Sequence, residues 1–71
     1  MSTHSVAKIV EIVGTSEKSW TDAADNGVKR ASKTIKNITG VQIQQMTASV
    51  KKGKIVRYKA TLKIAFGLED D

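Results

Sequence analysis

One stretch decides the fold of this chain: Gly14-Thr15-Ser16-Glu17-Lys18-Ser19-Trp20. Before it, the run Val6 to Val13 is rich in the β-branched side chains that strands prefer. After it, apolar side chains recur at helical spacing. The 71 residues then leave length only for one long hairpin. The order predicts a single α+β domain over residues 1–71, with a β-α-β-β plan and a three-stranded antiparallel sheet packed on one helix.

Size and the first strand both favour self-association. A 71-residue chain buries only ~60% of its unfolded surface. It has no cysteine for a disulfide staple, so oligomerisation is the remaining way to stabilise a small scaffold. The run Val6 to Val13 carries apolar side chains on both faces, which predicts that both faces are covered. We therefore expect a homo-oligomer.

The helix is predicted from about Glu17 to Lys36. Gly27 lies in its apolar stripe, where a close approach of the sheet would explain a residue that otherwise disfavours a helix. The stripe is formed by Trp20, Ala23, Ala24, Val28, Ala31 and Ile35.

The helix ends are less sharply marked than its apolar face. Thr15 or Ser16 can cap the start, but Ser19-Trp20-Thr21-Asp22 is a rival capping box one turn later. Asn37 is the predicted C-terminal stop.

The remaining residues predict a hairpin. The clearest period-two pattern of the chain lies within residues 55–66, where Val56, Tyr58, Ala60, Leu62, Ile64 and Phe66 alternate with Arg57, Lys59, Thr61, Lys63 and Ala65. The preceding strand, from Val41, changes parity at Gln44-Gln45, which predicts a β-bulge. Lys51-Lys52-Gly53-Lys54 is the predicted turn, with Gly53 at positive φ. Two strand orders stay open: the first strand beside the third, or the first strand at the centre.

Composition limits the classes of partner. The net charge of +5 is compatible with nucleic-acid binding or with a solvated basic surface. Because no Lys/Arg run is interleaved with aromatic residues, we expect no nucleic-acid partner. The start is polar and the first apolar run is short and broken by Lys8 and Glu11. We therefore expect no membrane partner and a cytoplasmic protein.

Residues suited to catalysis are scarce. His4 is the single histidine, and no Ser/His/Asp set forms around it, so we expect no enzyme. Glu17, Asp22 and Asp25 near the helix start either complement the helix dipole or ligate a hard cation.

Aromatic and amide side chains are the other candidates for a ligand site. Trp20 either packs in the core or a subunit contact, or stacks on a planar ligand. The amides Gln42, Gln44 and Gln45 either form a polar sheet face or interface, or bond a heteroaromatic edge.

Three segments together resemble the dodecins, which are small flavin-binding proteins that assemble as hollow dodecamers. They are Val13-Gly14-Thr15-Ser16 before a helix, the pair Arg30-Ala31 on that helix, and the final run Ile64 to Glu69. The resemblance extends from about Lys8 to Glu69. It implies a dodecin-like fold, a homododecamer and storage or sequestration of a flavin such as FMN or riboflavin.

The resemblance also implies where a flavin would bind and how this chain departs from the pattern. Dodecins carry a tryptophan that stacks on the flavin at the start of the second strand, where this chain has Gly40. They carry a glutamine that bonds the ring edge after an aromatic of the last strand, where this chain has Tyr58 and then Lys59. The implied cofactor-binding residues are Gly40, Gln42, Gln44, Tyr58 and Lys59. With both contacts replaced, we expect weak or no flavin binding.

Two alternative ligands remain from the sequence. The pair Ser19-Trp20 is similar to a dodecin branch for which a calcium association has been proposed, although no metal ligands can be matched residue by residue. Arg57, Lys59 and Lys63 share a predicted polar face that would suit an anionic cofactor. The alternative function is thus a non-flavin binding shell for calcium or an anion.

Overall fold

The computed structural model describes residues 6–68. His4 and the acidic tail Glu69–Asp71 lie outside the described residues. The elements, in chain order, are β1 (Ala7–Ser16), α1 (Trp20–Ala31), β2 (Ile38–Lys51) and β3 (Lys54–Gly67).

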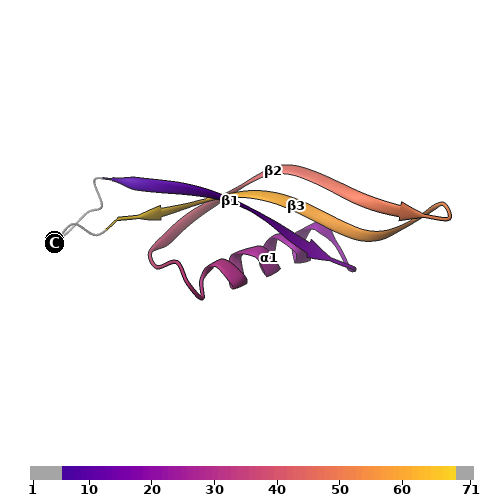
Figure 1. The fold of residues 1–71 in the computed structure, drawn as a ribbon, viewed down its shortest axis with the longest axis horizontal. Helices are drawn as coiled ribbons and strands as arrows, with labels where there is room; N and C mark the ends of the chain where they lie inside the picture. The colour runs from indigo at the N-terminus through magenta and orange to yellow at the C-terminus, as the bar shows by residue number, and fades with distance from the viewer. Residues whose placement is uncertain (1–5, 69–71) are drawn as a thin grey trace.

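The three strands form one antiparallel sheet in the order β1-β3-β2, which confirms the predicted β-α-β-β fold. The order that placed the first strand at the centre is wrong. The helix lies along one face of the sheet, and the far end of the β2–β3 hairpin projects beyond it (Figure 1). Within residues 6–68, no helix has the length and apolar character needed to cross a membrane.

The helix starts at the later of its two candidate caps. The Ser19 hydroxyl accepts a hydrogen bond from the Asp22 backbone N–H at 3.0 Å. Ser16 has a different role at the end of β1, where its hydroxyl accepts from the Lys18 N–H and donates to Asp22 Oδ2 at 2.7 Å. The first strand therefore extends to Ser16, beyond the predicted end at Val13.

The predicted helix is also too long at its C-terminal end. It ends at Ala31 with Ser32 as C-cap, and hydrogen-bonded turns follow instead of a further helical turn. Asn37 has a φ of 65°, but it lies directly before β2, where its carbonyl accepts from the Gly67 N–H. The prediction that Asn37 stops the helix is wrong. Ile35 still packs against the core from this irregular segment.

The core lies between α1 and the two strands β1 and β3. Ala60, Leu62 and Ile64 of β3 are buried against the alanines of α1. The helix approaches β1 closely because glycines face each other: a Cβ on Gly14 would overlap the Ala23 carbonyl oxygen. A Cβ on Gly27 would in turn lie 2.7 Å from Leu62 Cδ1 and 3.5 Å from Gly14 Cα, which explains the glycine within the helical stripe.

The hairpin follows its local sequence signals. The predicted bulge is confirmed, because the β2–β3 register shifts between Ile43 and Gln45. The predicted turn is confirmed too, with φ of 53° at Lys52 and 77° at Gly53. Two positive φ values in succession are those of a type I′ turn. Two further register shifts, at Ile38/Gly40 and Ser49/Val50, were not predicted.

Candidate functional site

The sheet has a face against α1 and an opposite face, here called the open face. Residues directly opposite each other on paired strands point to the same side of a sheet. The partners of the buried residues Ala60, Leu62 and Ile64 therefore share the helix side. The open face consists of Ile9, Glu11, Val13 and Thr15 on β1, Arg57, Lys59, Thr61, Lys63 and Ala65 on β3, and Gly40, Gln42, Gln45, Thr47, Ser49 and Lys51 on β2.

Three of the five predicted site residues lie on the open face, but at different ends of it. Gly40 pairs with Ala65 and Gln42 pairs with Lys63. Lys59 lies six residues before Ala65 on β3 and pairs with Thr47. At ~3.3 Å per residue, Gly40 and Lys59 are roughly 20 Å apart along the strands. One chain thus cannot bring both to the same side of a tricyclic flavin ring.

The other two predicted residues are placed differently. Tyr58 pairs with Ser16 and Ala48 on the helix side. Its ring lies edge-on to Trp20, with centroids 4.8 Å apart. Gln44 is the extra residue of the bulge between Ile43 and Gln45. The assignment of all five residues to a cofactor remains a prediction.

Trp20 is held between the helix and the hairpin. Its Nε1 donates a hydrogen bond to the Thr47 carbonyl at 2.8 Å, and its ring is half-buried. The indole is thus held by contacts within the chain, although Trp20 lies outside the buried core cluster.

Charges on the open face are balanced at one end only. Lys63 pairs with Glu11 of β1 on one side and with Gln42 of β2 on the other. Towards the hairpin tip, Lys59 pairs with Thr15 and Thr47, and Arg57 follows on the same face. The predicted basic polar face of the last strand is therefore one surface, and its cations near the hairpin have no acidic partner across the strands.

A groove of about 380 Å³ lies at this basic end. The sequence pattern predicts Arg57 and Lys59 as part of a basic face, but it does not predict that Ser49 and Lys51 of β2, or Glu17 after β1, lie beside them. These neighbours are determined by the cross-strand register, which cannot be read directly from the sequence. The groove, here called the hairpin groove, is lined by Glu17, Ser49, Lys51, Val56, Arg57 and Lys59.

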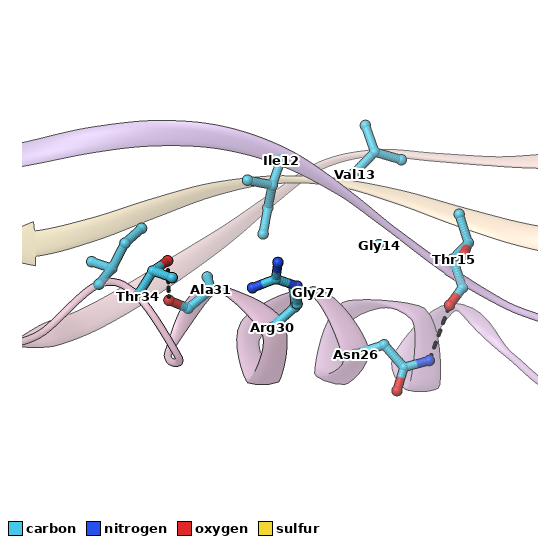
Figure 2. A pocket seen from close by; sticks show the side chains of 10 residues that line it. Ile12, Val13, Gly14, Thr15, Asn26, Gly27, Arg30, Ala31 and Thr34 are labelled. Atoms are coloured by element: carbon cyan, nitrogen blue, oxygen red, sulfur yellow. Dashed lines mark hydrogen bonds between the residues drawn. The ribbon is translucent and has the colours of Figure 1, made fainter.

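A second groove, of about 390 Å³, runs between β1 and α1. Figure 2 shows the Arg30 guanidinium directed from the helix towards the strand, beside Gly27 and Ile12. The Asn26 amide closes one end by donating to the Thr15 carbonyl at 3.0 Å. This groove is mostly apolar, and apart from the small residues Gly14 and Gly27 no pattern in the sequence predicts it.

Among the carboxylates at the helix start, Asp22 is held by its neighbours. Asp22 Oδ2 accepts from the Ser16 hydroxyl, and Asn26 Nδ2 lies 3.5 Å from the same oxygen. Among residues 6–68, no three His, Cys, Asp or Glu side chains gather closely enough to hold a metal ion.

Comparison with known proteins gives consistent matches over nearly the whole chain. The model of the Dodecin family matches residues 6–69. A dodecin from Thermus thermophilus is 29% identical over 65 residues, covering 92% of this chain and 94% of that protein. A protein named calcium dodecin, from Mycobacterium tuberculosis, is 31% identical over 62 residues and 87% of each chain. The solved structure of a dodecin from Streptomyces coelicolor superposes with a TM-score of 0.90 at 31% identity, covering 100% of both chains.

Proposed function

The chain belongs to the dodecin family, and on this premise we propose that it stores or sequesters a small ligand as a hollow homododecamer. The observation that carries the proposal is the separation of Gly40 and Lys59 on the open face. Because these positions are roughly 20 Å apart within one chain, a ligand that meets both must lie between copies. A closed shell with cyclic contacts places such copies side by side.

Exposed apolar side chains support the assembly. On β2, Val41, Ile43 and Met46 share the helix side of the sheet with the core, yet are 47%, 45% and 60% exposed. The helix covers mainly β1 and β3, so this strip has no cover within the described part of the chain. An apolar strip continuous with a core is the kind of surface that an obligate interface buries.

The flavin FMN or riboflavin is the ligand class that the family suggests, bound weakly here. Gly40 offers no ring to stack on, and Lys59 offers donors but no acceptor to the polar edge of the flavin. Gln42 lies two residues from Gly40 on the same face and is the nearest amide that could replace part of the lost contact.

Two measurements on the purified protein test the proposal. Light scattering should report a closed oligomer, with a dodecamer expected. Visible absorption, followed by titration of FMN while its fluorescence is recorded, should show quenching only at micromolar or higher protein concentration. A monomer at micromolar concentration would overturn the shell. Nanomolar flavin binding would overturn the weak-binding part alone.

Calcium is the second candidate, because one relative is named calcium dodecin. Within residues 6–68 one chain lacks a cluster of three acidic or histidine ligands, so a site would have to combine oxygens from different copies. Calcium titration of the assembled protein by calorimetry tests this, with saturable binding as the supporting result and none at millimolar calcium as the opposing one.

A further inference from the structure

We propose that the hairpin groove binds a small phosphate-bearing anion. The inference deepens the proposed function, since it names a ligand class for the open face of the same small-ligand-binding protein. Unlike the flavin contact, the groove is built within one chain.

Charge is the first argument. Lys51, Arg57 and Lys59 line the groove, against Glu17 as its one carboxylate. Lys54 pairs directly with Lys51 across the strands, so a fourth cation borders the same end. Like charges directly opposite each other destabilise a sheet, and a bound anion relieves the repulsion. Lys63 offers the contrast, because Glu11 is its direct partner on β1.

The backbone gives the second argument. Ser49 pairs with Arg57, but Val50 pairs with Ile55, so Val56 is an extra residue on β3. Ser49 and Lys51 are two residues apart on β2 and share the face of Arg57, and their side chains line one hollow. The extra residue on β3 places Lys54, and not Ile55, opposite Lys51. Bulges commonly re-aim side chains beside binding sites. Here the extra residue Val56 itself lines the groove, and the shifted register adds the cation Lys54 at its border.

The donor set selects phosphate among anions. A guanidinium presents a planar fork that binds phosphate oxygens in pairs, while lysines act as mobile point charges. A serine hydroxyl adds a neutral donor. Three cations exceed what a single carboxylate needs and suit the higher charge of a phosphate or pyrophosphate group.

The groove favours a small ligand over a nucleic acid. Its volume of about 380 Å³ is within the range of small-molecule pockets. Its lining holds no aromatic ring on which a base would stack.

The test is calorimetric titration with inorganic pyrophosphate and with ADP at low and at physiological salt. Parent protein is compared with Arg57→Gln and Lys51→Gln, and with Lys63→Gln as a control of equal charge change on the same face. We expect saturable binding that falls at least tenfold in the first two variants and less than twofold in the control. Tighter binding of ADP than of pyrophosphate assigns the phosphate to a nucleotide; equal binding assigns it to a free polyphosphate.

Three results would overturn the inference: no saturable binding at millimolar ligand, equal weakening by Lys63→Gln, or a short oligonucleotide that binds far more tightly with the same Arg57 dependence. Light scattering on the same samples separates the two proposals. An intact oligomer that does not bind pyrophosphate would contradict only the proposal that the hairpin groove binds an anion. A monomer that binds pyrophosphate would contradict only the proposal of a closed oligomer.

Discussion

Trp20 and Tyr58 meet edge-on, with ring centroids 4.8 Å apart and planes inclined by 80°. The indole Nε1 also donates to the Thr47 carbonyl on β2 at 2.8 Å. The first residue of α1 is thus attached to both strands of the hairpin, although the helix packs mainly on β1 and β3.

Shortening Trp20 should separate these two contacts. Trp20→Phe keeps a ring against Tyr58 but loses the hydrogen bond, at a cost of about 1 kcal/mol in the free energy of unfolding. Trp20→Ala loses both, at about 2–4 kcal/mol, somewhat below a fully buried ring because Trp20 is only half-buried. Urea unfolding followed by circular dichroism measures both. Equal losses in the two variants would show that the hydrogen bond, and not the ring contact, dominates.

The glycine contact between β1 and α1 offers a second stability test. Gly14→Ala should cost about 3 kcal/mol or more, because its Cβ would overlap the Ala23 carbonyl oxygen and backbone must move. Gly40→Ala is the matched control, since a Cβ at Gly40 meets nothing within 4 Å of it in the chain. Thermal unfolding of both should show a large fall for the first and a small change for the second. A stable Gly14→Ala protein would mean that the helix can move away from the strand freely.

The helix cap is a third test. Ser19→Ala should lower the free energy of unfolding by about 1 kcal/mol, because the Asp22 N–H loses its acceptor. Thr21→Ala, on the exposed side of the same turn, should be neutral or slightly stabilising. If the two variants behaved alike in denaturant titrations, Ser19 would not be the functional cap.

Features controlled by neighbouring residues were predictable from the sequence. The turn at Lys52-Gly53 and the bulge at Gln44 follow from local chemistry and parity, and both are confirmed. The C-terminal end of the helix was not predictable in this way, because apolar spacing indicates which side a residue faces and not its backbone conformation. Ile35 faces the core as its spacing predicted, yet it does so from a turn.

The candidate site was less predictable than the fold. Tyr58 and Lys59 are adjacent in sequence and were grouped together, but neighbours on a strand point to opposite sides of the sheet. Ser49 and Lys51 of β2 join Arg57 in one groove through the cross-strand pairing of Ser49 with Arg57. Such cross-strand placement depends on tertiary pairing, which a single sequence does not encode locally.

The exposed strip on β2 gives a test of assembly. Ile43→Glu should break or weaken the oligomer, because a buried charge without a partner is costly at an interface. Thr21→Glu, at an exposed position in the first turn of α1, carries the same charge and should leave the assembly intact. Sedimentation velocity of both variants measures the outcome. An unchanged oligomer in Ile43→Glu would place the subunit interface elsewhere.

Flavin affinity can be rebuilt if the register across Gly40 is right. Gly40→Trp with Lys59→Gln should raise FMN affinity by about 2 kcal/mol, from one ring stack and one hydrogen bond. The open space around Gly40 can receive a larger side chain, so the change need not disturb the fold. Fluorescence titration of FMN measures the gain, with each single variant expected to give only part of it. Because the two positions lie roughly 20 Å apart in one chain, the gain should vanish when Ile43→Glu dissociates the oligomer. No gain with the assembly intact would show that Gly40 does not occupy the stacking position, and a gain retained by the monomer would show that one chain suffices.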